Sequence, residues 1–128
     1  MKLTKEQLPK YVKSPKWYRF ILKLFKSNFR GITLYPFGIY VKKLDYPDMD
    51  SFINHENIHW RQQKEMLVIP FYLWYVIEWV VNIFKFGKRA YIKLSFEQEA
   101  YFNQKNLQYL KTRKFYAWTK YLKYKPVK

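Results

Sequence analysis

The sequence predicts an α+β domain that is predominantly helical, and three observations predict it. The chain has 128 residues, a length that suits one domain, 1–128. Its apolar content is 49%, with only three glycines, so it can bury a hydrophobic core. Apolar residues recur at helical spacing along most of the chain, while one short stretch, 32–42, is rich in β-prone residues.

The first predicted element is a basic helical segment, residues 1–30. This segment carries nine lysine or arginine residues and one acidic residue, Glu6. Within it, the range 17–28 places Phe20 and Leu24 on one face and cations on the other face. The spacing predicts an amphipathic helix.

A short β element follows this helix. Gly31 interrupts the helical pattern, and the ranges 32–35 and 39–42 are β-prone runs on either side of the turn-forming residues 36–38. A proline followed closely by a glycine is typical of a turn. The segment therefore predicts a small hairpin or an edge strand ahead of the next helix.

The best-defined helix begins after the loop 45–50. Asp50 or Ser51 can cap this helix, its first turn starts near Phe52, and it should run to about Val68. Helix-forming residues continue without glycine or proline through most of this range. We therefore expect one continuous helix here.

A second helix, 71–84, is expected after the proline at position 70, and it is apolar on nearly all sides. Such a helix belongs in the interior of the domain. A helix that lies on a membrane surface and a helix that spans the membrane are the alternatives. Glu78 and Asn82 argue against a span, and Glu78 should pair with Arg61 or a lysine.

Two further helices are expected toward the C-terminus. Ser95 and Gln98 have the spacing of a capping box, which predicts a helix over 96–110. The range 115–124 can add a short basic and aromatic helix. The chain thus divides into a basic N-terminal segment over 1–30, a core over 31–110 and a basic aromatic C-terminal tail or helix over 111–128.

The composition excludes several classes of function. The chain has no cysteine, which excludes disulfide scaffolds, thiolate zinc fingers, iron–sulfur clusters and cysteine nucleophiles. Any transition-metal site must therefore use histidine and carboxylate ligands.

The formal charge of +16 is concentrated at the two ends of the chain. Residues 31–104 carry eight basic and eight acidic side chains, so the central segment has no charge excess. We expect the basic ends to form a solvated exterior, with contact to an anionic surface as the alternative. Nucleic-acid binding is disfavoured, because the aromatic residues are not interleaved with arginine in a binding motif. The N-terminus has no signal-peptide pattern, which predicts a cytoplasmic protein with peripheral membrane contact as an option.

Both histidines of the chain belong to one H-E-x-x-H motif, His55-Glu56-Asn57-Ile58-His59. Residues four apart on a helix face the same way, so both imidazoles can reach one Zn²⁺ ion. Glu56 would then point toward the water at that ion and act as a general base. The motif therefore predicts a zinc site on the helix that starts near Phe52.

A hydrolytic zinc site needs three protein ligands and one open position. Gln62 and Glu65 stand where the metzincin pattern requires glycine and histidine, so that class is rejected. With no third histidine, the third ligand must be a carboxylate, and the candidates are Glu97 and Glu99. Side chains two residues apart on a helix point about 200° apart, so only one of these two can face the metal.

Two stretches of the sequence together resemble the small gluzincin-type zinc metallopeptidases of bacteria. These are residues 55–63, which contain the H-E-x-x-H motif, and residues 95–101, which follow the apolar helix. The resemblance implies a zincin-like core in which a strand, here within 32–41, lines the cleft ahead of the active-site helix. It also implies Glu97 as the third ligand, because Glu97 opens the E-x-x-A pattern of that group, with Glu99 in reserve.

Two residues are candidates for orienting the metal ligands. Many gluzincins carry Asp or Asn four residues after the ligand glutamate, where this chain has Tyr101, whose phenol can still bond to a partner of the site. Gln62 lies seven residues after His55 on the same face and is the other candidate. Tyr72 and Tyr75 could supply an oxyanion donor, but with 13 tyrosines in the chain neither is assigned.

The leading hypothesis is therefore a zinc-dependent peptidase. His55, His59 and Glu97 would hold Zn²⁺, while Glu56 would take a proton from the attacking water and pass it to the leaving amine. The substrate would be a peptide or a protein. The alternative is a catalytically silent metal-binding or interaction protein that docks on an acidic partner or a membrane surface.

Overall fold

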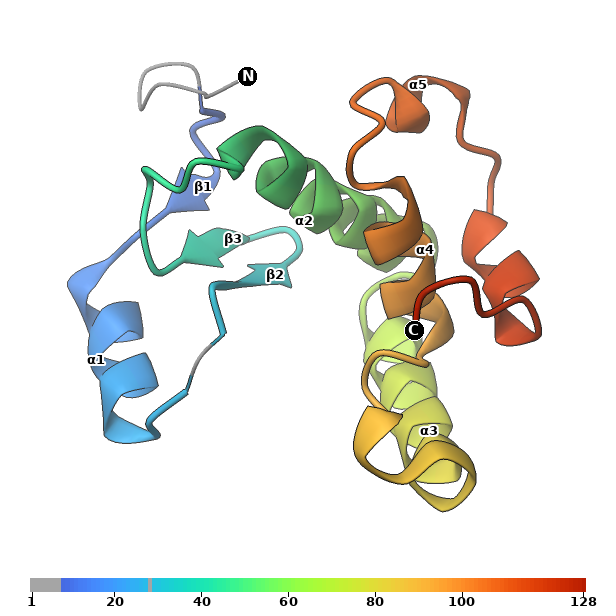
Figure 1. Ribbon diagram of the computed structural model, residues 1–128. Helices are drawn as coiled ribbons and strands as arrows, with labels where there is room; N and C mark the ends of the chain where they lie inside the picture. Colours follow the sequence, from blue (N-terminus) through green and yellow to red (C-terminus); the bar gives the residue numbers. More distant parts are fainter. Residues whose placement is uncertain (1–7, 28) are drawn as a thin grey trace.

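The computed structural model describes residues 8–27 and 29–128, and its architecture is α+β and mostly helical (Figure 1). The prediction of a predominantly helical α+β fold is confirmed. Residues 1–7 and Asn28, which fall in the predicted basic segment, lie outside the described residues. The elements in chain order are β1 (Val12–Lys13), α1 (Lys16–Leu24), β2 (Gly31–Leu34), β3 (Gly38–Val41), α2 (Met49–Glu65), α3 (Ile69–Phe86), the 3-10 helix η2 (Gly87–Arg89), α4 (Ser95–Asn103), α5 (Tyr109–Thr112) and the 3-10 helix η3 (Ala117–Leu122).

The three strands form a small mixed sheet in the order β1-β3-β2. β1 runs parallel to β3, and β2 runs antiparallel to β3 in the predicted hairpin, with Thr33 opposite Ile39. Gly38 is required where β1 closes on this hairpin, because a Cβ there would lie 2.8 Å from the carbonyl oxygen of Tyr11. β2 is an edge strand and lies against α2, where the Thr33 hydroxyl contacts Glu56.

The N-terminal helix α1 is shorter than predicted, since it ends at Leu24 instead of continuing toward position 28. The chain leaves the helix at Phe25, and Lys26 adopts a positive φ of 51°. Only Tyr18 and Leu22 of this helix are buried. The predicted apolar face with Phe20 and Leu24 is therefore exposed.

Helix α2 joins the sheet to the helical half of the molecule (Figure 1). It starts at Met49, so Asp50 and Ser51 lie inside its first turn and the predicted cap at these residues is wrong. The reason is tertiary packing, because the Met49 side chain is fully buried beside Ile39 and Val41 of β3.

The chain turns sharply between α2 and α3. Leu67 and Val68 adopt positive φ values of 61° and 60°, so α2 ends at Glu65 and not near position 68. The axes of α2 and of the following helical stretch are bent by 113°. In the described part of the chain no single helix passes the length and hydropathy test for a membrane span, whereas this bent pair passes it as a pair.

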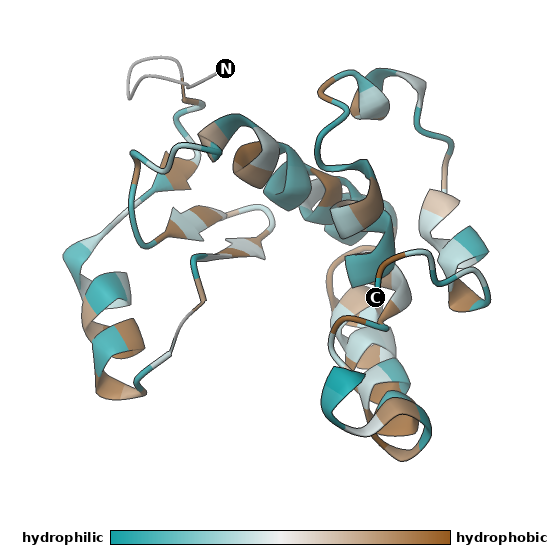
Figure 2. Cartoon of the chain, in the orientation of Figure 1, coloured by the Kyte–Doolittle hydropathy of each residue, from teal (hydrophilic) through white to brown (hydrophobic). Residues whose placement is uncertain are grey.

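Helix α3 extends over 18 residues, Ile69–Phe86, and the prediction that it lies in the interior is wrong. Leu73, Ile77 and Phe84 are 63%, 53% and 87% exposed, and only Phe71 and Asn82 are classed as buried. Figure 2 shows the apolar character of this helix on the outside of the molecule. One face of α3 packs on the rest of the described chain, which is too small to cover the other faces.

Helix α4 also differs from its prediction. It ends at Asn103 and not near position 110, because the Asn54 side-chain amide donates to the carbonyl oxygens of Asn103, Gln104 and Asn106 at 3.3, 2.7 and 3.0 Å and draws this part of the chain toward α2. The Ser95 hydroxyl bonds to Glu78 at 2.6 Å and does not form the predicted capping box.

The C-terminal region folds back along α4. The helix expected over 115–124 is the shorter 3-10 helix η3, and its Trp118 packs against Phe96 of α4 with ring centroids 4.7 Å apart. Lys125 pairs with Glu78 across 3.5 Å, which agrees with the expected lysine partner of that carboxylate. Two apolar cores result, one between the sheet and the start of α2 and the other among α3, α4 and η3.

Candidate metal centre

Helices α2 and α4 cross so that His55, His59 and Glu97 meet in the interior. One ligand atom from each lies within 4.8 Å of the others, and the three residues are 7%, 7% and 3% exposed. The two Nε2 atoms are 3.1 Å apart, and the Glu97 carboxylate lies 3.2 Å from His59 Nε2 and 3.4 Å from His55 Nε2. The three side chains are therefore close enough to bind one metal ion.

Both imidazoles are oriented by glutamine side chains. His55 Nδ1 lies 2.8 Å from Gln104 Oε1, and His59 Nδ1 lies 2.8 Å from Gln62 Oε1. Because an amide oxygen only accepts hydrogen bonds, each Nδ1 carries a hydrogen and donates it. In the neutral imidazoles this leaves the lone pair on each Nε2, the atom that faces Glu97.

The orientation of the Gln62 amide is itself fixed. Its Nε2 donates to the Phe96 carbonyl at 3.1 Å and to the Glu99 carboxylate at 2.9 Å, which leaves the amide oxygen for His59. Two imidazole lone pairs and a carboxylate that converge in this way repel one another unless a cation or a proton lies between them. The donor set fits a divalent transition metal with three protein ligands.

The protonation of the cluster agrees with this interpretation. Burial is the largest single influence and lowers the pKa of His59, but the charge and hydrogen bond of Glu97, the charge of Glu56 and the hydrogen bond of Gln62 together outweigh it and raise the pKa to about 9. Burial likewise raises the pKa of Glu97, but the charge of His59 and the close contacts with the two imidazoles hold it well below its usual range. In the metal-free protein a proton therefore holds the pair together, and a metal ion would displace that proton.

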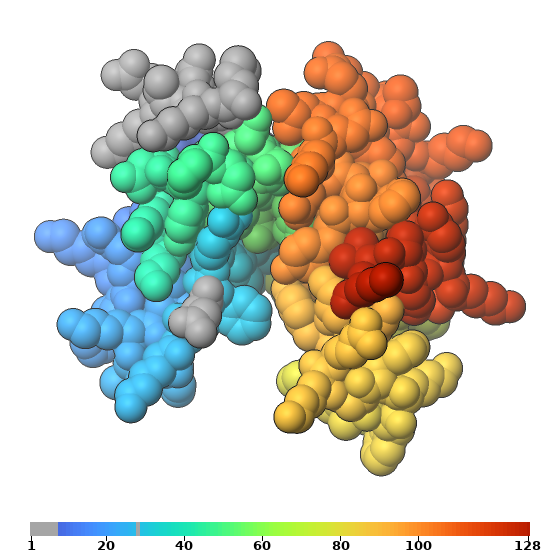
Figure 3. All heavy atoms as spheres, viewed as in Figure 1, coloured from blue at the N-terminus to red at the C-terminus, as the bar shows by residue number. Residues whose placement is uncertain are grey.

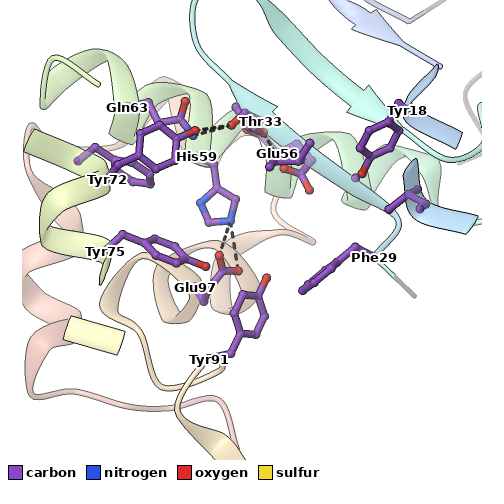
Figure 4. A pocket seen from close by; sticks show the side chains of 14 residues that line it. Tyr18, Phe29, Thr33, Glu56, His59, Gln63, Tyr72, Tyr75, Tyr91 and Glu97 are labelled. Atoms are coloured by element: carbon purple, nitrogen blue, oxygen red, sulfur yellow. Dashed lines mark hydrogen bonds and ion pairs between the residues drawn. The ribbon is translucent and has the colours of Figure 1, made fainter. Parts of the chain in front are cut away.

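Glu56 lies beside the cluster and is not part of it. Its Oε2 accepts a hydrogen bond of 2.6 Å from the Thr33 hydroxyl of β2. Glu56, His59 and Glu97 line the same cavity of about 320 Å³ (Figure 4). A second cavity of about 390 Å³ lies on the His55 side and is also lined by Glu56. The carboxylate therefore has access to both spaces next to the cluster.

Two tyrosines face the cluster from the other side of the first cavity. Figure 4 shows Tyr75 of α3 and Tyr91 directed toward Glu97. Burial and the charge of Glu97 raise the pKa of both phenols, so both stay neutral and can donate hydrogen bonds. Tyr91 was missed in the sequence, where no spacing distinguishes it from the other tyrosines.

Tyr101 contacts the site with its ring. The ring packs edge-on against His55 with centroids 4.4 Å apart, while Gln104 bonds to the imidazole nitrogen of His55. The sequence did not point to Gln104, which lies just beyond the end of α4. Its only signal is the distance of seven residues from Glu97, which is a weak one.

Glu99, the reserve candidate for the third ligand, belongs to a buried ionic network instead. It receives hydrogen bonds from Arg113, from Gln62 at 2.9 Å and from the Tyr109 hydroxyl at 2.7 Å. Arg113 also donates to Glu65 at 2.7 and 2.9 Å. The network therefore links the end of α2 to α4 and supports the glutamine that orients His59.

The chain matches no protein-family model, no curated protein and no solved structure.

Proposed function

We propose that the protein is a metal-dependent hydrolase, a zinc peptidase of gluzincin type with a zincin-like core. The observation that carries this proposal is the convergence of two oriented imidazoles and a carboxylate beside a second, independently held carboxylate, Glu56. The first three supply the ligand set of a catalytic zinc site, which keeps one position open. The fourth lies in the same cavity and suits a general base.

The chemistry divides between the ion and the side chains. A bound zinc ion polarises a carbonyl group and lowers the pKa of a water molecule. Glu56 would take the proton of that water and deliver it to the leaving amine, and the Thr33 hydroxyl keeps its carboxylate in place. Tyr75 and Tyr91 are neutral donors at the opposite wall of the cavity and could bond to the developing oxyanion.

The edge strand β2 suits an extended peptide substrate. In an antiparallel ladder, residue pairs that are hydrogen-bonded alternate with pairs that are not. Lys42 N donates to Arg30 O at 2.7 Å, so Arg30 and Lys42 form a hydrogen-bonded pair. The backbone groups of Gly31 and Thr33, in the pairs between, therefore point away from β3. Gln63 already accepts from Tyr35 N and donates to Thr33 O, each at 2.8 Å, while Gly31 lines the cavity. The Tyr72 hydroxyl also donates to Thr33 O at 3.2 Å, so a peptide strand would pair with the backbone groups of Gly31 and not with the Thr33 carbonyl.

The cavity wall indicates which peptides to test. Most of its lining is apolar or aromatic, with Leu22, Ile32 and Phe71 among the aliphatic and aromatic side chains. An apolar side chain of the substrate fits such a surface, because its burial there releases water. We expect cleavage next to large apolar residues.

The test compares hydrolysis of a library of quenched fluorescent peptides by the wild-type protein and by Glu56→Gln. The variant should bind zinc as the wild type does, while turnover falls by about 10²–10⁴-fold, the usual contribution of a general base. Asp45→Asn, which makes the same chemical change at an exposed position, is the matched control and should keep full activity. Wild-type protein that holds zinc and cleaves nothing would contradict the proposal and favour the catalytically silent alternative.

A further inference from the structure

Helix α3 has its polar and apolar faces inverted relative to a helix on a water-soluble surface. The side chains that face the protein recur at helical spacing, namely Phe71, Tyr75, Glu78 and Asn82. The centre of the opposite face consists of Leu73, Ile77, Val80 and Phe84, which are 63%, 53%, 46% and 87% exposed. A helix in water normally buries its apolar face and exposes its polar face.

The polar residues of α3 are used inside the protein. Glu78 accepts hydrogen bonds from Ser95 N at 2.8 Å and from the Ser95 hydroxyl at 2.6 Å, and Asn82 donates to the Ala90 carbonyl at 3.1 Å. The helix is thus held to α4 and to the segment just before it by polar contacts, and it presents apolar side chains outward. Such an arrangement is stable when an apolar medium covers the outer face.

Helix α1 also exposes an apolar stripe, although the two side chains that it buries are Tyr18 and Leu22. The apolar residues at helical spacing are Trp17, Phe20, Ile21 and Leu24, and their side chains are 53%, 64%, 42% and 63% exposed, respectively. Phe25, directly after the helix, is 74% exposed. Two separate helices therefore present apolar stripes. Single exposed apolar residues are common on protein surfaces, but continuous stripes on two helices indicate an interaction surface.

The two helices project to the same side of the molecule. Figure 1 shows α1 and α3 extending in one direction from the level of α2, and Figure 3 shows a hollow between them. Residues of both helices, including Leu22 and Phe71, line the cavity next to the metal centre. Leu24 is the last residue of α1, and Phe84 lies two residues before the end of α3. Both residues are therefore at the helix ends that project to this side.

The charges beside these stripes identify the partner. The exposed cations that flank the two apolar stripes are Lys16, Arg19, Lys23, Lys26, Lys85 and Lys88. Helices α1 and α3 contain one acidic residue between them, Glu78, which is bonded inward to Ser95. A second copy would place like charges together in a chain of net charge +16, whereas an anionic lipid surface would neutralise them.

We infer that the exposed apolar stripes of α1 and α3, together with their flanking lysines, form a docking surface for an anionic lipid bilayer. Apolar stripes that include or adjoin tryptophans, here Trp17 and Trp74, and that are flanked by lysine are typical of helices that lie in the membrane interface. The apolar side chains enter the region below the headgroups, and the lysines contact lipid phosphates. The cavity at the metal centre then lies between two membrane-bound helices.

The test is flotation of the full-length protein with vesicles. Vesicles of equal parts phosphatidylcholine and phosphatidylglycerol should carry the protein, and binding should weaken as salt rises or when phosphatidylglycerol is left out. Leu24→Glu and Phe84→Glu should each reduce binding by about tenfold or more, the effect of losing the burial of one large apolar side chain. Phe115→Glu is the matched control, because Phe115 is 75% exposed but lies outside both helices, and it should bind like the wild type.

Three results would overturn the inference. These are wild-type protein that does not float with anionic vesicles, a Phe115→Glu loss as large as that of the two helix variants, and a stable dimer that Leu24→Glu and Phe84→Glu dissociate. The last result would assign the surface to a second copy. Glu56→Gln should bind vesicles like the wild type, so this test does not depend on whether the protein hydrolyses peptides.

Discussion

Helices α2 and α3 are neighbours in the chain and opposite in character. α2 buries both histidines, Glu56, Gln62 and Gln63, whereas α3 exposes most of its apolar side chains. The contrast shows that hydropathy alone does not decide which residues are buried. A polar side chain is stable inside when a partner satisfies it, and an apolar side chain stays outside when the described part of the chain offers no cover.

Among the buried polar residues around α2, the largest effect on stability is expected at Arg113, which pairs with Glu65 and Glu99. Arg113→Met would leave the carboxylates of Glu65 and Glu99 buried without their cation, which typically costs about 3–5 kcal/mol of unfolding free energy. Urea unfolding of the metal-free protein measures this loss. Arg19→Met on the exposed side of α1 is the matched control and should change stability by less than about 0.5 kcal/mol. Equal stability of both variants would break the comparison.

A smaller effect is expected from Gln104, which orients a ligand without binding the metal itself. Gln104→Ala removes the acceptor for His55 Nδ1, and the loss of such a partner typically weakens metal binding by about 10–100-fold. Competition with a fluorescent zinc chelator measures the dissociation constant. Gln108→Ala, also a glutamine on the C-terminal side of α4, serves as the control. An unchanged affinity in Gln104→Ala would mean that the His55 tautomer is set by another group.

The smallest effect is expected on the exposed side of α3. Leu73→Ala should change the unfolding free energy in water by no more than about 0.5 kcal/mol, because Leu73 is 63% exposed. Phe71→Ala on the inward face of the same helix should cost about 3–5 kcal/mol, because Phe71 is 2% exposed and packs against Phe96. Similar losses in the two variants would show that α3 is covered on both faces in solution.

The sequence predicted the parts of the protein that depend on local rules. The spacing of His55 and His59 determines that they share a helix face, and the hairpin follows from the turn residues before Gly38. The early start of α2 was missed because burial of Met49 outweighs the capping preference of Asp50.

The remaining errors have a tertiary origin. The position of Gln104 depends on how the chain leaves α4, where Asn54 binds three carbonyl oxygens, and no residue spacing encodes that turn. The exposure of α3 depends on how much chain is available to cover it. A hydropathy pattern predicts that this helix seeks an apolar environment, but the pattern does not say whether that environment is the protein's own core.

The most direct test of the central claim is the metal content of the purified full-length protein. Inductively coupled plasma mass spectrometry after dialysis should find one zinc ion per folded wild-type chain, and X-ray absorption should show imidazole nitrogen and carboxylate oxygen as its protein ligands. His59→Ala and Glu97→Ala should lose the metal while circular dichroism reports intact helices. A folded wild-type protein without stoichiometric metal in excess zinc, or a His59→Ala variant that retains it, would contradict the assignment.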